Sequence, residues 1–257
     1  MTFNKLRSIN LYQILIFLIL GAISFQLVWS DQYLAYLQPQ FSVLVILSGV
    51  LFILFAVSLI FGKGPVPHQD TAGFLPGIII LLPLLFLINS KGSSLGSGAF
   101  ENRVLDSNIV QNNLNEAVEE NPISVEQLMS QSLTDRDGQP PVSYEQADIN
   151  ELLNNAGQFR NRPVMIKGVI QELPGVEWAD AVIYRFFITC CAADARPLGV
   201  YIPSLGFQKF EKGDWVEVKG SYRIATVGSK IVPTIHPDSV QKIPTPPVNQ
   251  QYLYFGN

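Results

Sequence analysis

The segment "GDWVEVKGSYRIAT" (residues 213–226) is the most informative part of the C-terminal half of the chain. Val216 and Val218 alternate with Glu217 and Lys219, so every second side chain faces the same side, as in a strand with one buried face. Gly220 follows directly, and a glycine there lets a strongly coiled strand bend where a barrel closes. The segment therefore predicts a long, bent strand of a small β-barrel.

Runs of similar character lie on both sides of this segment and are separated by turn residues. In "VMIKGVI", Gly168 follows a strand pattern as Gly220 does. Five short strands at this spacing predict a small sandwich or barrel, and the two glycine-containing strands resemble an OB-fold. The expected strands are residues 162–173, 181–190, 198–203, 213–226 and 229–237, followed by a short additional strand segment, residues 239–243.

A short helix is expected just before the first of these strands. Asp148 stands at an N-cap position, Glu151 follows three residues later, and Gly157 is placed where a helix would stop. Residues 143–257 are therefore predicted to form an OB-like barrel domain with a preceding helix and a proline-rich tail. The fold class is α + β, anchored to a membrane as argued next.

The N-terminal third has a different composition from the barrel. The chain is 48% hydrophobic and 15% charged, whereas soluble domains carry about a quarter charged residues. Residues 11–29 and 41–61 contain no charge, and each is close to the ~20 apolar residues that cross a bilayer. Residues 73–89 form a third, shorter apolar run with Pro76 and Pro83. We predict three spans within residues 1–89, with a re-entrant segment as the alternative for the third.

The distribution of lysine and arginine predicts the orientation. Lys5 and Arg7 precede the first span, Lys63 follows the second, and residues 30–40 contain neither. Positively charged loops stay in the cytoplasm, so the N-terminus is expected inside and the barrel outside a bacterial inner membrane. Residues 90–142 are rich in glycine, serine, asparagine and glutamine and are expected to form a polar, flexible linker.

Nucleic-acid binding, common among OB-folds, is not expected here. The barrel offers aromatic side chains, but its lysines and arginines alternate with acidic residues, and the formal net charge of the chain is −4. No Ser/His/Asp arrangement, phosphate-binding glycine loop or carboxylate pair indicates catalysis, so the protein is not expected to be an enzyme.

Several segments together resemble the YcgQ-type bacterial membrane proteins. The similarity includes "YLQP" (residues 36–39), "YRFFITCCAADARPLGVYI" (residues 184–202), "DWVEVKG" (residues 214–220) and "IPTPPVNQQYLYF" (residues 243–255). The resemblance implies a two-component permease, in which this chain is the accessory subunit of a multi-spanning, permease-like partner in the lipid bilayer.

Cys190 and Cys191 are the only cysteines of the chain, and three interpretations of the pair stay open. They are small core residues, a strained vicinal disulfide, or soft-metal ligands together with Asp194 and His236. Zinc is the first candidate ion. If Cys191 lies beyond the end of the strand, the two sulfurs can converge, whereas within one strand they would point to opposite faces.

Two further residues are candidates beside the cysteine pair. Arg185 lies in an apolar strand and therefore needs an anionic partner, for which Asp194 is the natural choice. His68 lies before the third span, where a solvated loop histidine is the alternative to a functional one.

The leading functional hypothesis is an accessory permease subunit whose barrel binds a ligand or metal ion through the Cys-Cys-x-Ala-Asp motif (residues 190–194). The alternative is a membrane-anchored thiol-redox or metal-holding protein that acts without a permease.

Overall fold

A computed structural model describes residues 2–61, 95–101, 103, 123–124, 143–206, 209–227 and 230–254. These residues form two compact units. One contains the two long N-terminal helices and residues 190–193, and the other contains the remaining described residues from Leu95 onward.

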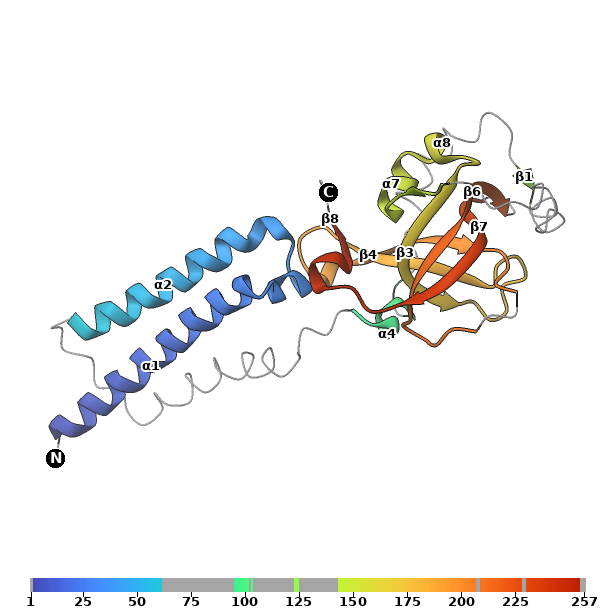
Figure 1. The fold of residues 1–257 in the computed structure, drawn as a ribbon. Helices are drawn as coiled ribbons and strands as arrows, with labels where there is room; N and C mark the ends of the chain where they lie inside the picture. The colour runs from blue at the N-terminus through green and yellow to red at the C-terminus, as the bar shows by residue number, and fades with distance from the viewer. Residues whose placement is uncertain are drawn as a thin grey trace. The chain divides into compact units, whose positions relative to one another are not determined.

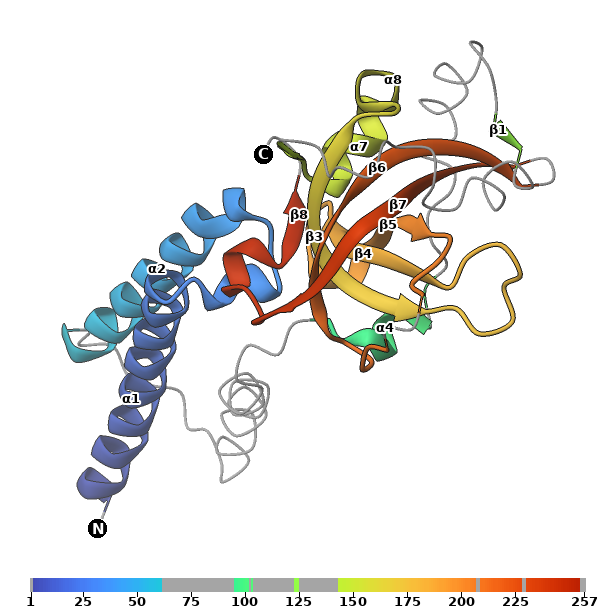
Figure 2. The same cartoon turned by 45° about the vertical axis from the view of Figure 1, so that its right-hand side comes forward.

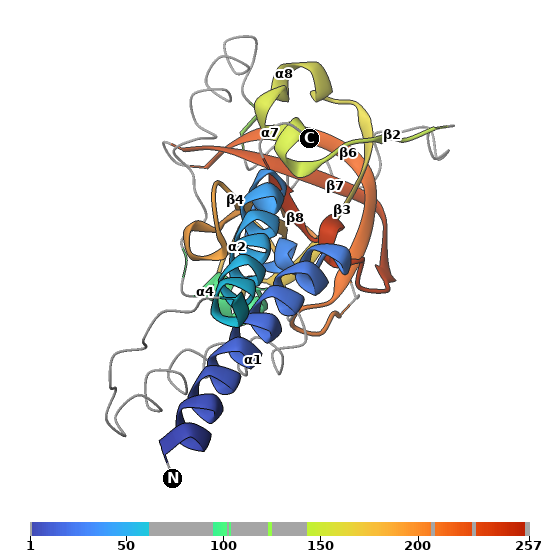
Figure 3. The same ribbon diagram turned by 90° about the vertical axis from the view of Figure 1, so that its left-hand side faces the viewer.

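The first unit is built on an antiparallel helix hairpin (Figure 3). Helix α1 (Thr2–Trp29) and helix α2 (Ser42–Phe61) are joined by an interhelical turn, residues 30–41, that contains the 3-10 helices η1 (Gln32–Ala35) and η2 (Pro39–Phe41). Small residues line the helix contact. A Cβ atom added to Gly49 would lie 3.1 Å from the Cβ atom of Ser24, and one added to Gly21 would lie 3.0 Å from Ile53. Close approach of the two backbones therefore depends on these glycines.

The predicted spans correspond to the hairpin only in part. Among the described residues, Pro39–Phe61 is the one helical segment whose length and composition suit a membrane crossing, with 23 residues. Gln13–Trp29, within the first predicted span, is a shorter apolar helix. The third predicted span, residues 73–89, lies outside the described residues, and so does His68.

The second unit is a closed five-stranded barrel (Figure 1). Its sheet order is β6-β7-β5-β4-β3, and β3 pairs with β6 to close the ring. All neighbouring pairs are antiparallel except β5 with β7. This connectivity is that of an OB-fold, as the sequence predicted. The strands are β3 (Pro163–Glu172), β4 (Ala181–Ile188), β5 (Arg196–Ile202), β6 (Trp215–Val227) and β7 (Lys230–Ile243).

Two glycines allow the barrel to close. The β6–β7 register shifts between Lys219 and Gly220, and a Cβ atom at Gly220 would lie 2.1 Å from the carbonyl oxygen of His236. A Cβ atom at Gly168 would lie 2.8 Å from the carbonyl oxygen of Tyr184. Both positions therefore require glycine, and the long strands β6 and β7 bend strongly (Figure 2). The predicted additional strand segment, residues 239–243, is part of β7, which runs without interruption to Ile243.

Two short helices, α7 (Ile149–Asn154) and α8 (Ala156–Phe159), precede the barrel and contribute to its core. Asp148 and Glu151 form the predicted capping box at the start of α7. Leu152 is fully buried, and its carbonyl accepts a hydrogen bond of 3.2 Å from the hydroxyl of Tyr222. The predicted stop at Gly157 is wrong, because α7 ends at Asn154 and Gly157 lies inside α8.

Strand β4 is covered on both faces, which explains its nearly continuous apolar sequence. One face lines the barrel core, and the other carries a second cluster that includes Tyr184, Phe186 and Ile188. Strand β8 (Tyr252–Tyr254), from the proline-rich tail, pairs in parallel with β4, and helix α4 (Ser97–Glu101) packs on the same cluster.

The expected linker, residues 90–142, is thus more ordered than predicted where the structure describes it. The Phe100 ring lies 4.3 Å from that of Tyr184, and the amide of Leu95 donates to the Tyr252 hydroxyl at 2.7 Å. The short strand β1 (Ile123–Ser124) pairs with β6, and β2 (Glu145–Gln146) pairs with β3. Residues 104–122 and 125–142 lie outside the described residues.

Candidate functional site

The two cysteines lie in the loop between β4 and β5, residues 189–195, here called the cysteine loop. Strand β4 ends at Ile188, and the 3-10 helix η4 (Ala192–Asp194) begins directly after Cys191. Cys190 is exposed and Cys191 is half-buried, and neither belongs to the barrel core. The interpretation of the pair as core residues is therefore wrong. No disulfide joins the two cysteines.

The loop brings together three of the four predicted metal ligands. One ligand atom from each of Cys190, Cys191 and Asp194 lies within 4.8 Å of the others. Two sulfurs that bind one zinc ion at about 2.3 Å each are separated by less than about 4.6 Å. Small side-chain rotations in this loop would therefore place all three ligands on a single ion. The predicted convergence of the sulfurs follows from the bend at Thr189 and Cys190, directly after the end of β4.

The carboxylate of Asp194 is oriented by the backbone of the same loop. Its Oδ1 atom accepts a hydrogen bond of 3.1 Å from the amide of Thr189. A hydrogen bond of this kind holds a ligating carboxylate in position, as partners of metal ligands usually do. Asp194 therefore closes the loop across its two ends and faces the cysteines.

Within the first unit, residues 190–192 of the cysteine loop pair with the interhelical turn. Leu37 and Cys191 form an antiparallel bridge. The amide of Gln38 donates to the carbonyl of Cys190 at 3.2 Å, and the amide of Ala192 donates to the carbonyl of Tyr36 at 2.8 Å. These two bonds flank the bridge, so Leu37 and Cys191 are a non-hydrogen-bonded pair whose side chains lie close together. Nothing in the sequence predicted this pairing.

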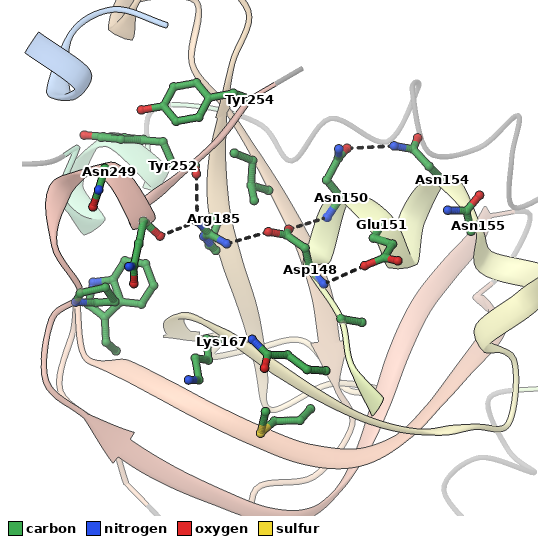
Figure 4. Close-up of a pocket in the computed structure, with 17 residues that line it drawn as sticks. Asp148, Asn150, Glu151, Asn154, Asn155, Lys167, Arg185, Asn249, Tyr252 and Tyr254 are labelled. Atoms are coloured by element: carbon green, nitrogen blue, oxygen red, sulfur yellow. Dashed lines mark hydrogen bonds and ion pairs between the residues drawn. The ribbon is translucent and has the colours of Figure 1, made fainter. Parts of the chain in front are cut away.

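Arg185 pairs with Asp148 and not with the predicted partner Asp194. Its Nη1 atom lies 2.9 Å from Oδ2 of Asp148, the N-cap residue of α7 (Figure 4). The same guanidinium donates to tail carbonyls, at 2.8 Å to Tyr252, at 3.4 Å to Gln251, and also to Gln250. Arg185 therefore fastens the C-terminal tail and α7 to the middle of β4. This role is structural.

Burial sets the electrostatics around Arg185. The side chain is 12% exposed, and its burial lowers the pKa of the guanidinium, while the carboxylate of Asp148 opposes that shift. Arginine stays protonated in either case. A cavity of about 1000 Å³ lies beside the pair, between α7 and the tail, and its polar lining includes Asn150, Asn154 and Asn249 (Figure 4).

His236 is not part of the cysteine group. It lies in the middle of β7, opposite Ser221 of β6, and the metal-ligand cluster consists of the three residues of the cysteine loop. Burial and the nearby charge of Arg223 lower the pKa of His236 to about 4. Its Nε2 atom is buried without a hydrogen-bond partner among the described residues. The structure therefore brings three of the four predicted ligands together and leaves His236 outside that group.

Most of the barrel's aromatic side chains that could stack on nucleic-acid bases are instead occupied in packing. Tyr184, Phe186, Phe187 and Tyr222 are buried, and Tyr201 is half-buried against Trp178, with ring centroids 4.6 Å apart. A stacking platform needs an exposed ring face, which the four buried side chains do not offer.

Comparisons with known proteins concern the barrel domain. Residues 143–255 match the family model of the DUF1980 C-terminal domain. Among solved structures, the OB domain of a protein from Methanosarcina mazei is 11% identical and covers 40% of this chain and 88% of its own, with a TM-score of 0.26. A DUF3299 family protein from Pseudomonas aeruginosa PAO1 is 15% identical and covers 35% and 66%, with a TM-score of 0.23. No curated protein matches the chain.

Proposed function

We propose that this protein is a membrane-anchored, metal-holding protein that binds zinc through Cys190, Cys191 and Asp194. The observation that carries the proposal is the convergence of two thiols and a carboxylate to within 4.8 Å in one short loop. Thiolates select borderline and soft ions, and a carboxylate beside them suits zinc better than copper(I), which prefers sulfur ligands alone.

The number and exposure of the ligands point to reversible binding. Structural zinc sites are closed by four protein ligands, whereas sites with three keep a position open for water or another ligand. Cys190 is exposed, so an incoming donor can reach the ion. A site of this kind suits transient holding and transfer of the ion.

The composition of the hairpin surface supports a membrane anchor. Small residues such as Gly49 and Ala56 are buried between the helices, while large apolar residues such as Leu47, Leu54 and Phe61 are exposed. Water-soluble helices show the opposite arrangement, and membrane helices pack through small residues. We place the N-terminus inside and the barrel outside the bacterial inner membrane.

The bridge between Leu37 and Cys191 supports this topology by a parity argument. Both residues must lie on the same side of the membrane, because their backbones are hydrogen-bonded. If α2 crosses the membrane once after Leu37, the chain must cross once more before it reaches the barrel. The apolar residues 73–89 are the segment that the sequence offers for this second crossing.

A multi-spanning, permease-like partner completes the proposal. Transporters enclose their substrate between many helices. An anchor of two or three spans is too small to do so alone and therefore needs a partner to form the transport path across the membrane. The resemblance to accessory permease subunits supports the same conclusion. The test is purification of the tagged chain in mild detergent. Isolation of the chain without a multi-spanning partner would favour the alternative, a metal-holding or thiol-redox protein that acts alone.

Cobalt(II) substitution tests the metal site directly. The wild-type chain should show intense sulfur-to-cobalt charge-transfer absorption when titrated with cobalt under reducing conditions. The double variant Cys190→Ser and Cys191→Ser should lose that absorption, and Asp194→Asn should keep it with weaker binding. Asp238→Asn, an exposed acidic position in β7, is the matched control and should behave as wild type. Cobalt spectra without sulfur charge transfer in the wild type would refute the site.

A further inference from the structure

We propose that the interhelical turn, through residues 36–38, positions the cysteine loop for metal binding, so that metal affinity and the conformation of the helix hairpin are coupled. This inference rests on the proposed function, since it concerns the regulation of the same site. Residues 36–38 and residues 190–193 of the cysteine loop belong to one compact unit.

Adjacent cysteines need a bent backbone to share a ligand, because successive side chains in a strand point to opposite faces. In the cysteine loop, the chain bends at Thr189 and Cys190, directly before Cys191, which forms the bridge, and η4 begins at Ala192. Both neighbours of Cys191 are bonded to the turn, through the Cys190 carbonyl and the Ala192 amide. These two bonds hold the backbone on both sides of Cys191 and thereby fix the direction of its Cα–Cβ bond.

The turn is well suited to hold this geometry. Leu34 and Ala35 are buried, and so is Gln38, which is 4% exposed. The amide of Tyr36 is itself bonded to the carbonyl of Tyr33 at 2.9 Å. A movement of α1 against α2 would therefore shift the turn, and the shift would be passed to the cysteines through backbone hydrogen bonds. Coupling of this kind is reciprocal, so metal binding must stabilise the paired turn by the same factor.

Gln38 offers a substitution that removes one bond with little other strain. Its φ of −66° and ψ of 149° are values that proline adopts readily. In Gln38→Pro, the ring replaces the amide hydrogen that points at the Cys190 carbonyl, so the hydrogen bond becomes a steric conflict. Gln38→Ala keeps the amide and removes the side chain, including its contact with Gln40, and is the matched control.

The experiment measures zinc affinity of the full chain in detergent, by competition with a chromophoric chelator under reducing conditions. Outer partners of metal ligands typically contribute 10–100-fold to affinity, so Gln38→Pro should weaken zinc binding by about tenfold or more. Gln38→Ala should bind as wild type. Equal affinity of wild type and Gln38→Pro would overturn the coupling and leave the metal site intact. Failure of the wild type to bind zinc would overturn both proposals.

A second measurement needs no variant and is independent of any folding defect in Gln38→Pro. Hydrogen exchange of the Gln38 and Ala192 amides is followed in the wild type with and without zinc. By reciprocity, zinc should slow exchange at both amides by about the factor found in the affinity measurement. Unchanged exchange at both amides in the zinc-saturated protein would contradict the coupling.

Discussion

Arg185 and Asp148 form an ion pair of 2.9 Å that joins the N-cap of α7 to the middle of strand β4. The pair is asymmetric, since the arginine side chain is 12% exposed and the aspartate 43%. The guanidinium also bonds three carbonyls of residues 250–252, so it fixes the position of β8. One side chain therefore connects three segments that lie far apart in the sequence.

Replacement of this arginine should destabilise the protein. Arg185→Met removes the donors for Asp148 and for the tail, and we expect a loss of about 2–3 kcal/mol in unfolding free energy. Urea unfolding followed by tryptophan fluorescence measures the loss. Arg162→Met is the control, because Arg162 is 58% exposed and its 3.6 Å pair with Glu145 should contribute no more than about 1 kcal/mol. Equal losses in the two variants would show that Arg185 does not hold the tail.

The closure of the barrel depends on Gly220. In Gly220→Ala, the new methyl group would meet the carbonyl of His236 at 2.1 Å, so β6 and β7 must separate at the bulge. We expect a loss of about 3 kcal/mol or more, the upper end for overpacking. Gly98→Ala is the control, since a Cβ there meets nothing within 4 Å. Thermal melts of both variants test the prediction, and a wild-type melt for Gly220→Ala would refute the closure argument.

The strands were predictable because their pattern is local. Each sequence signal lies within a few residues of the feature that it predicts. These signals are the alternation around Val216 and Val218, the glycines at 168 and 220, and the capping residues Asp148 and Glu151. They determine where strands bend and where α7 begins. The order of the strands then follows from the small number of ways to close five strands of these lengths.

The three ligands of the candidate site lie within five residues of sequence and were predicted, but the contacts around them are not local and the sequence could not supply them. Arg185 lies 37 residues from Asp148 in the sequence. Its place in an apolar strand indicates that it needs an anionic partner but does not indicate which residue that partner is. Strand β8 has three residues within a proline-rich tail, too short for a visible period. The pairing of Leu37 with Cys191 joins two irregular segments through backbone atoms, which carry no sequence signature.

Acid should weaken the barrel through His236. The folded-state pKa of about 4 lies below the ordinary 6.5, so between these values the unfolded chain binds more protons. The stability contributed by neutral His236 is therefore full above pH 6.5 and is lost as the pH falls toward 4. Melting temperatures from pH 7.5 to 4 should fall more steeply for wild type than for His236→Leu.

The ion pair of Asp214 does not interfere with this measurement. A hydrogen bond from Lys242 lowers the pKa of Asp214 below its ordinary value of 3.8, so the stability from this pair is lost only below pH 3.8, in wild type and variant alike. The difference between the two curves therefore isolates His236. Parallel curves across the whole range would show that His236 is not buried in its neutral form.

The bridge between Leu37 and Cys191 predicts a specific cross-link. Non-hydrogen-bonded antiparallel pairs have Cα atoms about 4.5 Å apart, within the range of a disulfide. The double variant Leu37→Cys and Cys190→Ser should therefore form an intramolecular disulfide with Cys191 in oxidised membranes, detected by mass spectrometry after proteolysis. Trp29→Cys with Cys190→Ser is the control, because Trp29 is 94% exposed and forms no bridge with the cysteine loop. Absence of the cross-link, or equal cross-linking in the control, would contradict the parity argument.

Zinc stoichiometry of the purified, reduced, full-length protein tests the central claim most directly. Equilibrium dialysis against buffered zinc, followed by elemental analysis, should give about one ion per chain for the wild type, because the loop supplies one set of three ligands. The double variant Cys190→Ser and Cys191→Ser should retain none above background, while its barrel still melts cooperatively, since neither thiol is in the core. A wild-type chain that binds no zinc, or a double variant that binds it equally well, would contradict the account.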